Sequence, residues 1–160
     1  MKITDVKVHI LQSKLEQPFA FSQGWVRVRS ATIVEIHTDA GLIGWGEAFT
    51  QGLESPQIAA STIEYSLKPL VLGENPKNVE VLWHSMYNQT RDFGRKGSVM
   101  AAISGIDIAV WDILGKFYQV PVSQLIGGRF RASVQPYATG FYRVTGENEG
   151  DRLAEEATAH

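Results

Sequence analysis

Cysteine is absent from this sequence, so it can form neither a disulfide nor a thiolate metal or catalytic site. Blocks of like charge are absent too, because 15 basic and 17 acidic side chains leave a formal net charge of −2 at pH 7. The sequence therefore lacks the electrostatic footprint of a protein that binds nucleic acid or anionic lipid. It also lacks any uncharged apolar run near the ~20 residues that a membrane span requires.

The composition that remains is that of a folded domain. The 160 residues are 44% hydrophobic and 20% charged, far from the composition of disordered chains. This length suffices for one domain with a substantial core, whereas a complete eight-stranded α/β barrel needs about 250 residues. Residues 1–11 alternate polar and apolar side chains instead of forming the apolar core of a signal peptide. Together with the lack of cysteine, this favours a cytoplasmic location.

The N-terminal third predicts a small antiparallel sheet. Three segments have the alternation or β-branched composition of strands: residues 5–10, 32–38 and 42–48. Residues 12–24 lose the alternation and contain proline and glycine, so we expect a long loop there, with residues 25–29 as its return arm or a short strand. A turn at residues 39–41, with glycine in its last position, joins the last two strands.

The middle of the chain changes to a helical period. Ser55 before Pro56 is an N-cap signal, and the helix that starts there should run until Pro69. Asn75-Pro76 predicts a second helix by the same device. The strongest helical pattern covers residues 98–118, and it is apolar on both sides, so we expect this helix to lie between two layers.

The C-terminal segment resembles the start of a larger unit. Residues 133–139 predict a buried strand, and residues 147–160 begin a helix that shows no C-terminal cap. A parallel strand needs a partner strand beyond its crossover helix. In the isolated chain we therefore expect an exposed apolar flank around Ile108 and Trp111.

Few short motifs indicate chemistry on their own. The segment 44–46 lacks the third glycine of a dinucleotide fingerprint, so its glycines fit a close backbone approach better, and Glu47 beside it fits a structural acceptor. Asp107 and Asp112 do not share a helix face, which excludes a paired acid and base or a metal clamp. Asp112 and Lys116 have the spacing of a helical ion pair.

Other candidate sites are weaker still. The four histidines, His9, His37, His84 and His160, lie singly in distant elements without the spacing of metal ligands. No serine lies in a GxSxG nucleophile motif. Residues 91–97 carry three cations and two glycines ahead of a helix and could hold an anion, although a solvated linker explains them as simply.

One run is specific enough to indicate a family. Residues 102–116, AISGIDIAVWDILGK, with VPV at 120–122 and LIGG at 125–128, resemble the signature of the mandelate racemase/muconate lactonizing enzyme group of the enolase superfamily. GLIGWGE at residues 41–47 resembles the hairpin of the same group. The resemblance covers residues 1–158.

The resemblance implies an α+β fold with a three-stranded antiparallel sheet followed by a helical bundle. Residues 1–128 would form the capping domain that closes the mouth of a modified TIM barrel. Residues 129–160 would form the first β/α unit of an incomplete, truncated barrel.

The resemblance also implies a substrate-facing surface. Residues 16–29 and the segment after Glu47 resemble the two flexible capping loops of the family. The candidate substrate-binding residues are Phe19, Phe21, Trp25, Arg27, Thr50, Gln51, Tyr137 and Arg143. Arg29 is a further possible donor to a carboxylate.

Chemistry in this family removes a proton α to a carboxylate, with Mg²⁺ stabilising the enediolate and a lysine or histidine as base. The family's lysine pair and acidic ligands belong to later barrel strands, whereas the last lysine here is Lys116 and no Lys-x-Lys occurs. We therefore expect no catalytic residue and no metal ligand in this chain, with Mg²⁺ bound by the barrel domain of a parent enzyme. The chain alone should be inactive.

For the parent enzyme we predict an acid-sugar dehydratase that acts on a small carboxylate such as a sugar acid and forms a homo-oligomer. Residues 137–143 resemble the corresponding segment of such dehydratases. A racemase, epimerase or cycloisomerase of the same group is the alternative, because the fold does not fix the reaction. A non-catalytic α+β module that binds a ligand or partner is the alternative from another class.

Overall fold

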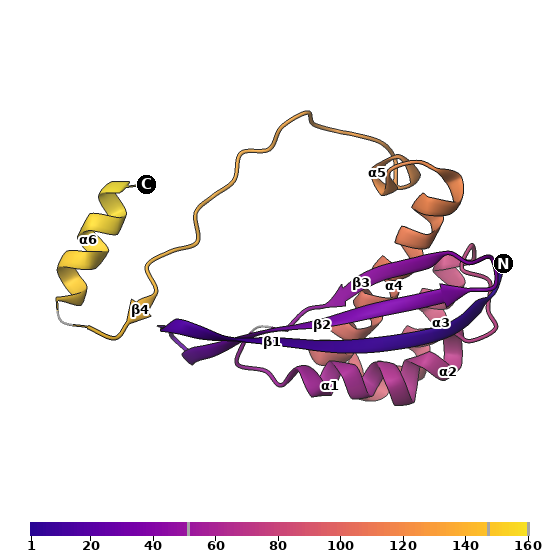
Figure 1. The fold of residues 1–160 in the computed structure, drawn as a ribbon, viewed down its shortest axis with the longest axis horizontal. Helices are drawn as coiled ribbons and strands as arrows, with labels where there is room; N and C mark the ends of the chain where they lie inside the picture. The colour runs from indigo at the N-terminus through magenta and orange to yellow at the C-terminus, as the bar shows by residue number, and fades with distance from the viewer. Residues whose placement is uncertain (51, 147, 160) are drawn as a thin grey trace.

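The computed structural model describes residues 1–50, 52–146 and 148–159. It consists of an antiparallel sheet with helices packed on one face and a C-terminal segment that arches back to the far end of the sheet (Figure 1). The strands are β1 (Ile3–Phe21), β2 (Gly24–Thr38), β3 (Ile43–Ala48) and β4 (Arg143–Val144), in the order β3-β2-β1-β4.

β1 and β2 form one long hairpin, so the predicted loop over residues 12–24 is wrong. The strands pair along almost their whole length, with irregularities in register between Ile3 and Asp5 and, farther along β1, between Lys14 and Phe19. Pro18 falls inside the second irregularity, where the missing N–H breaks no ladder hydrogen bond. The alternative that residues 25–29 form a strand is confirmed, because they are part of β2.

Helices cover one face of this sheet. In chain order they are α1 (Pro56–Ser61), the π-helical η1 (Thr62–Leu67), α2 (Lys68–Val71), α3 (Val79–Gly94), α4 (Ser98–Tyr118) and α5 (Val122–Leu125), with α6 (Glu149–Ala159) set apart beside β4. The start of α1 at Pro56, directly after Ser55, confirms the predicted N-terminal signal.

Two predicted helix boundaries are wrong. The first helical segment continues past Pro69 to the end of α2, because the wider turn of η1 directly before it accommodates a ring that would clash with a preceding α-helical turn. α3 begins at Val79 instead of Asn75-Pro76. The residues between form a turn in which the N–H of Asn78 donates to the carbonyl of Asn75 at 3.0 Å.

α4 is the central helix, and its bounds confirm the prediction over residues 98–118. By length and composition alone it is apolar enough to cross a membrane. In the structure, Ile106 and Ile113 are fully buried in a core that includes Val34 and Ile36 of β2. Packing against the sheet and α3 therefore accounts for the apolar composition of this helix.

One flank of α4 is open in the part of the chain that the structure describes. Ile108 is 47% exposed and, with Trp45, Trp111 and Ile126, lines an apolar groove of about 530 Å³. The expectation that both sides of the helix are covered is wrong here, and the expected exposed flank at Ile108 and Trp111 is confirmed.

α4 and β3 approach each other at backbone distance. A Cβ atom on Gly44 would lie 2.1 Å from the carbonyl oxygen of Ala109, and one on Gly46 would lie 2.1 Å from that of Gly105. Both separations are far below van der Waals contact, so no larger residue fits without moving the helix from the strand. The prediction that these strand glycines serve close backbone approach is confirmed.

An ion pair on α4 provides hydrogen-bond partners for two backbone groups at the free edge of β3. Lys116 Nζ lies 2.7 Å from Asp112 Oδ2, which confirms the predicted helical pair. The N–H of Trp45 donates to the same carboxylate at 2.8 Å, and Lys116 donates to the carbonyl of Ile43 at 2.7 Å. Two polar backbone groups of an edge strand thus have partners on the helix, which blocks them from pairing with another chain.

The C-terminal segment differs from its prediction. Residues 133–139 are exposed and have no regular secondary structure, so the predicted buried strand is wrong. A strand needs hydrogen-bonded neighbours, and among the described residues none lies beside this segment. Instead, β4 pairs with Phe19 and Ala20 of β1, which makes the sheet four-stranded. No barrel portion is evident in the described residues, although α6 follows as a helix.

The backbone contact between β3 and α4 predicts a large effect of one methyl group. Gly46→Ala should lower the free energy of unfolding by about 3 kcal/mol or more, because the added Cβ meets the carbonyl of Gly105. Urea denaturation followed by circular dichroism measures this change. Gly150→Ala adds the same group to α6 with nothing within 4 Å and should be neutral or slightly stabilising. Equal stability of the two variants would contradict the described packing.

Candidate functional site

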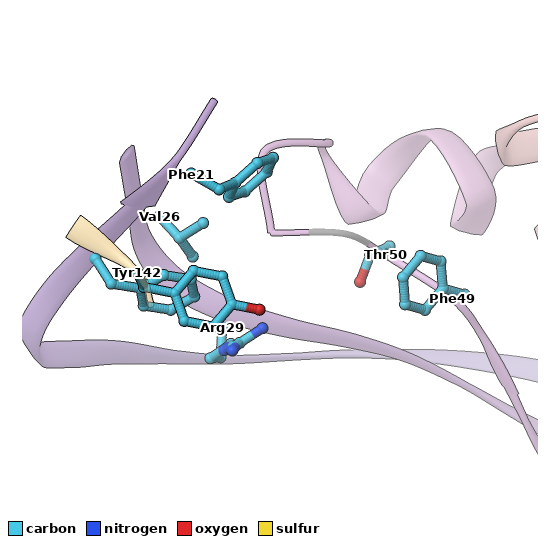
Figure 2. Close-up of a pocket in the computed structure, with 7 residues that line it drawn as sticks. Phe21, Val26, Arg29, Phe49, Thr50 and Tyr142 are labelled. Atoms are coloured by element: carbon cyan, nitrogen blue, oxygen red, sulfur yellow. The ribbon is translucent and has the colours of Figure 1, made fainter. Parts of the chain in front are cut away.

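A cavity of about 370 Å³ lies at the far end of the β1–β2 hairpin, where three separate segments meet. Its lining residues come from the hairpin, from the segment directly after β3 and from the turn before β4: Phe19, Phe21, Val26, Arg29, Phe49, Thr50 and Tyr142. Figure 2 shows Phe21, Val26 and Tyr142 on one side, with Phe49 and Thr50 on the other. The volume lies within the range of small-molecule sites, about 300–1,000 Å³.

Three side chains in contact with one another form one wall of the cavity. The rings of Phe19 and Tyr142 lie 4.7 Å apart between centroids, and the guanidinium carbon of Arg29 lies 4.9 Å from the centroid of Phe19. The face of an aromatic ring attracts a cation, so this contact holds the charged guanidinium of Arg29 in place at the cavity. The polar ends of Tyr142 and Arg29 point toward the space between the two sides (Figure 2).

Thr50 contributes a polar atom from the opposite side. Its side chain is buried at 8% exposure, and its hydroxyl donates to the carbonyl of Ser30 at 3.0 Å. Because that bond uses its only proton, the hydroxyl oxygen can act toward a ligand only as an acceptor. The cavity thus combines aromatic walls, one guanidinium and hydroxyl groups, a set that suits a small anionic and hydroxylated ligand.

α6 fixes the turn that carries Tyr142. Arg152 donates to the carbonyl of Tyr142 at 2.5 Å and pairs with Glu156 at 3.0 Å. Glu156 in turn accepts from the N–H of Phe141 at 2.8 Å, and Phe141 has a φ of 60°, a left-handed conformation that is unfavourable for a residue with a side chain. The pair of Arg152 and Glu156 therefore holds the strained backbone at Phe141, and the next residue, Tyr142, forms part of the cavity wall.

Three of the predicted substrate-binding residues, Phe19, Phe21 and Thr50, line this cavity. Trp25 and Arg27 lie on β2 outside the lining, and the guanidinium of Arg27 stands 5.9 Å from the Trp25 ring. Gln51 lies outside the described residues.

The two predicted residues of the C-terminal segment lie elsewhere. Tyr137 is 88% exposed in the irregular segment, away from the cavity lining. Arg143 belongs to β4 and lies 3.6 Å from the carboxylate of Glu149. Its neighbour Tyr142 lines the cavity instead. No sequence signal shows which of Tyr142 and Arg143 faces the cavity, because the pairing of β4 with β1 determines this.

Phe49 and Val26 also line the cavity without having been predicted. Phe49 lies between the end of β3 and Thr50. It therefore belongs to the segment after Glu47 that was expected to face the substrate, although it was not itself named. Glu47 itself is exposed on β3. Among the described residues, no group of three or more His, Cys, Asp or Glu side chains could hold a metal ion.

Residues 91–97, which could hold an anion or form a solvated linker, are helical as far as Gly94. α3 continues to Gly94, so residues 95–97 alone connect it to α4. On α4, Asp107 is half-buried, and burial raises its pKa, with the charge of Glu80 raising it further. Neither place brings together a base, a nucleophile and a donor to an oxyanion.

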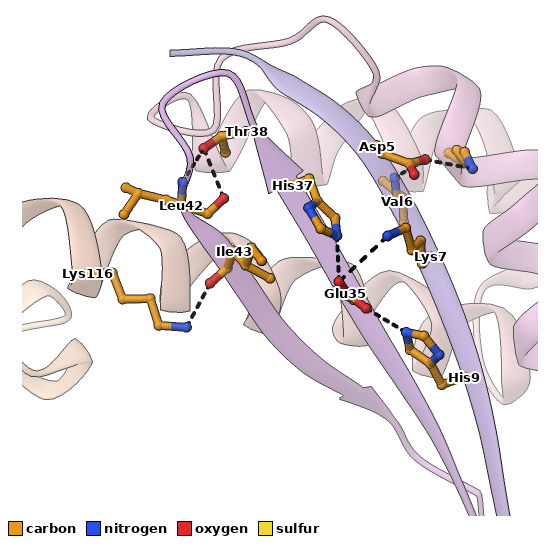
Figure 3. Close-up of polar contacts among 11 residues, drawn as sticks. Asp5, Val6, Lys7, His9, Glu35, His37, Thr38, Leu42, Ile43 and Lys116 are labelled. Carbon is orange, nitrogen blue, oxygen red and sulfur yellow. Dashed lines mark hydrogen bonds and ion pairs between the residues drawn. The ribbon is translucent and has the colours of Figure 1, made fainter.

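Two histidines do share a carboxylate, which corrects the expectation that they lie singly. His9 Nε2 lies 2.7 Å from Glu35 Oε2, and His37 Nε2 lies 2.5 Å from Glu35 Oε1, with Lys7 Nζ at 3.9 Å (Figure 3). The spacing hid this cluster because His9 reaches Glu35 across the hairpin. The hydrogen bond from His9 lowers the pKa of Glu35 most, and His37 and Lys7 lower it further.

The described residues thus form an α+β domain with a ligand-sized cavity at the end of its long hairpin. Residues 3–127 match the family described as "Mandelate racemase / muconate lactonizing enzyme, N-terminal domain". The chain belongs to this family, a part of the enolase superfamily.

Relatives at the level of sequence include a cycloisomerase, a dehydratase and a racemase. The chain is 37% identical over 158 residues to D-galactarolactone cycloisomerase of Agrobacterium fabrum, covering 99% of this chain and 40% of that enzyme. It is 45% identical over 109 residues to arabinonate dehydratase of Saccharolobus solfataricus, covering 68% of this chain and 28% of that enzyme.

A solved relative confirms the fold. The crystal structure of the 3,6-anhydro-D-galactonate cycloisomerase from Zobellia galactanivorans matches with a TM-score of 0.78 at 36% identity, covering 98% of this chain and 39% of that one. The chain thus spans two fifths or less of the length of these relatives.

The Glu35 cluster predicts a pH dependence of stability. The pKa of Glu35 is lower in the folded protein than its ordinary value of 4.5, so the ionised carboxylate stabilises the fold above pH 4.5 and this contribution is lost as pH falls below that value. Glu35→Gln should therefore flatten the decline in unfolding free energy below pH 4.5, measured by urea denaturation across pH 3–7. Asp5, whose pKa a hydrogen bond from Lys68 lowers, keeps part of the decline.

Glu47→Gln provides the matched control, because Glu47 is an exposed glutamate on β3. It should keep the wild-type dependence on pH. A Glu35→Gln profile that parallels the wild type would contradict the role of the cluster.

Proposed function

We propose that this chain is the substrate-facing cap of an enzyme that removes a proton α to the carboxylate of a sugar acid. The observation that carries the proposal is the cavity at the hairpin end, which combines aromatic walls with the guanidinium of Arg29 and the hydroxyls of Thr50 and Tyr142. A sugar acid offers a carboxylate to the guanidinium of Arg29 and hydroxyl groups to Thr50 and Tyr142.

Dehydration is the reaction that we propose first. Arabinonate dehydratase, at 45% identity, is by its name an enzyme that acts on a sugar acid. In such a reaction the α proton leaves to a base, and the β hydroxyl leaves as water with the help of an acid. Cycloisomerisation is the second candidate, because the two cycloisomerases match nearly the whole of this chain.

Enzymes of the enolase superfamily use a divalent metal, which stabilises the enediolate. The described residues offer no ligand set for such an ion. We therefore assign them the tasks of binding the remote part of the substrate, orienting it and excluding water with the aromatic walls. The metal ligands and the base would come from outside the described residues.

A fusion protein tests this proposal. Residues 1–159 of this chain replace the matched region of D-galactarolactone cycloisomerase, and the product is incubated in D₂O with Mg²⁺ and a set of sugar acids and their lactones. Exchange of the α proton, measured by NMR, is the expected result, because the proposed enzyme removes that proton. The 160-residue chain under the same conditions should show no exchange.

A fusion that unfolds cooperatively and binds Mg²⁺, but exchanges no α proton in any sugar acid, would show that this chain does not serve as a cap for such substrates. Exchange with loss of water would favour the dehydratase, and exchange with ring opening or closure the cycloisomerase.

A further inference from the structure

Arg29 is a cation at the cavity that has no carboxylate partner within 4.0 Å among the described residues. Some cationic side chains do have one, such as Lys68 with Asp5, Arg143 with Glu149 and Arg152 with Glu156. Arg29 is the cationic side chain among the residues that line the cavity. The contact of Arg29 is with the face of Phe19. Within residues 1–50, 52–146 and 148–159, no acidic side chain therefore balances the charge of Arg29 where it lines the cavity.

The contact with Phe19 leaves the donors of Arg29 available. A guanidinium carries five N–H donors, and a cation–π contact with a ring face uses none of them in a conventional hydrogen bond. Two of these donors can bind the two oxygens of one carboxylate at once. The chemistry that these donors recognise best is thus a planar anion with two oxygens.

The remaining polar atoms of the cavity match a hydroxylated chain beside that anion. Thr50 is left as an acceptor by its bond to Ser30, so it suits a ligand hydroxyl that donates. Tyr142 carries a hydroxyl on the same side as Arg29, with its ring fixed against Phe19. The cavity therefore provides an anion position with hydroxyl positions next to it.

We propose that Arg29 binds a second carboxylate of the substrate, at the end remote from the reacting carbon, so that the substrate class is the dicarboxylic sugar acids. This inference rests on the proposed function. In that function the metal would hold the carboxylate next to the reacting carbon, and the described residues contain no group of three side chains that could hold such an ion. A carboxylate bound at Arg29 is consequently a different one. A monocarboxylic sugar acid would leave this guanidinium without an anion.

Binding to the 160-residue chain tests the carboxylate position. Wild-type protein is titrated with D-galactonate and with the uncharged galactitol at pH 7 and low salt, and affinity is followed by NMR shifts of the cavity residues. We expect binding of D-galactonate and at least tenfold weaker binding of galactitol. Arg29→Gln should weaken D-galactonate binding about tenfold or more, since a charge-assisted pair is lost.

Lys14→Gln is the matched control for charge. Lys14 is exposed on β1 opposite Val28, next to the strand position of Arg29, and it does not line the cavity. It removes the same charge from the same region and should change affinity less than twofold. Equal losses in the two variants, or equal binding of D-galactonate and galactitol, would overturn the carboxylate position at Arg29.

The fusion protein tests the second carboxylate. We expect its kcat/KM to be about tenfold higher for D-galactarate, which has two carboxylates, than for D-galactonate, and Arg29→Gln should remove this preference. Arg29→Lys, which keeps the charge without the two-donor edge, should restore part of it. A fusion that acts equally on both acids overturns this inference alone. A fusion that acts on no sugar acid contradicts the proposed function, while the titration still decides whether Arg29 binds a carboxylate.

Discussion

The backbone contact between β3 and α4 is the constraint on which the rest of this structure depends. Gly44 and Gly46 let the strand lie directly on the carbonyls of Gly105 and Ala109, and no side chain larger than hydrogen fits there. That distance sets the depth of the core between sheet and helix. It also places the end of β3, and with it the segment that lines the cavity, relative to the hairpin.

The cavity is built in a different way from this rigid contact. Its walls belong to three segments that are distant in sequence: the end of a long hairpin, the residues after β3 and the turn before β4. Such an arrangement allows the ligand-facing side chains to vary without disturbing the core. α6 adds a second support, because Arg152 and Glu156 hold the turn that carries Tyr142.

The sequence predicted those features that depend on local pattern. The period of α4, the strand glycines and the pair of Asp112 with Lys116 all follow from spacing along one element, and the structure confirms them. The hairpin end was not predicted because Pro18 lies in a register irregularity, where a proline does not interrupt the strand. The helix past Pro69 was not predicted because a π-helical turn before this proline lets the helix continue. No residue pattern indicates either feature. The position of Tyr142 and the sharing of Glu35 by two histidines depend on strand pairing across the sheet, which spacing alone does not reveal.

Amide hydrogen exchange at Trp45 tests the central contact most directly. The N–H of an edge strand exchanges quickly when it faces water, but that of Trp45 donates to Asp112 on α4. We predict that it exchanges as slowly as the amides of the buried β2 core, and that Asp112→Ala accelerates exchange at Trp45 while Val34 stays protected. Rapid exchange of the Trp45 amide in the wild-type protein, beside a protected β2, would contradict the account.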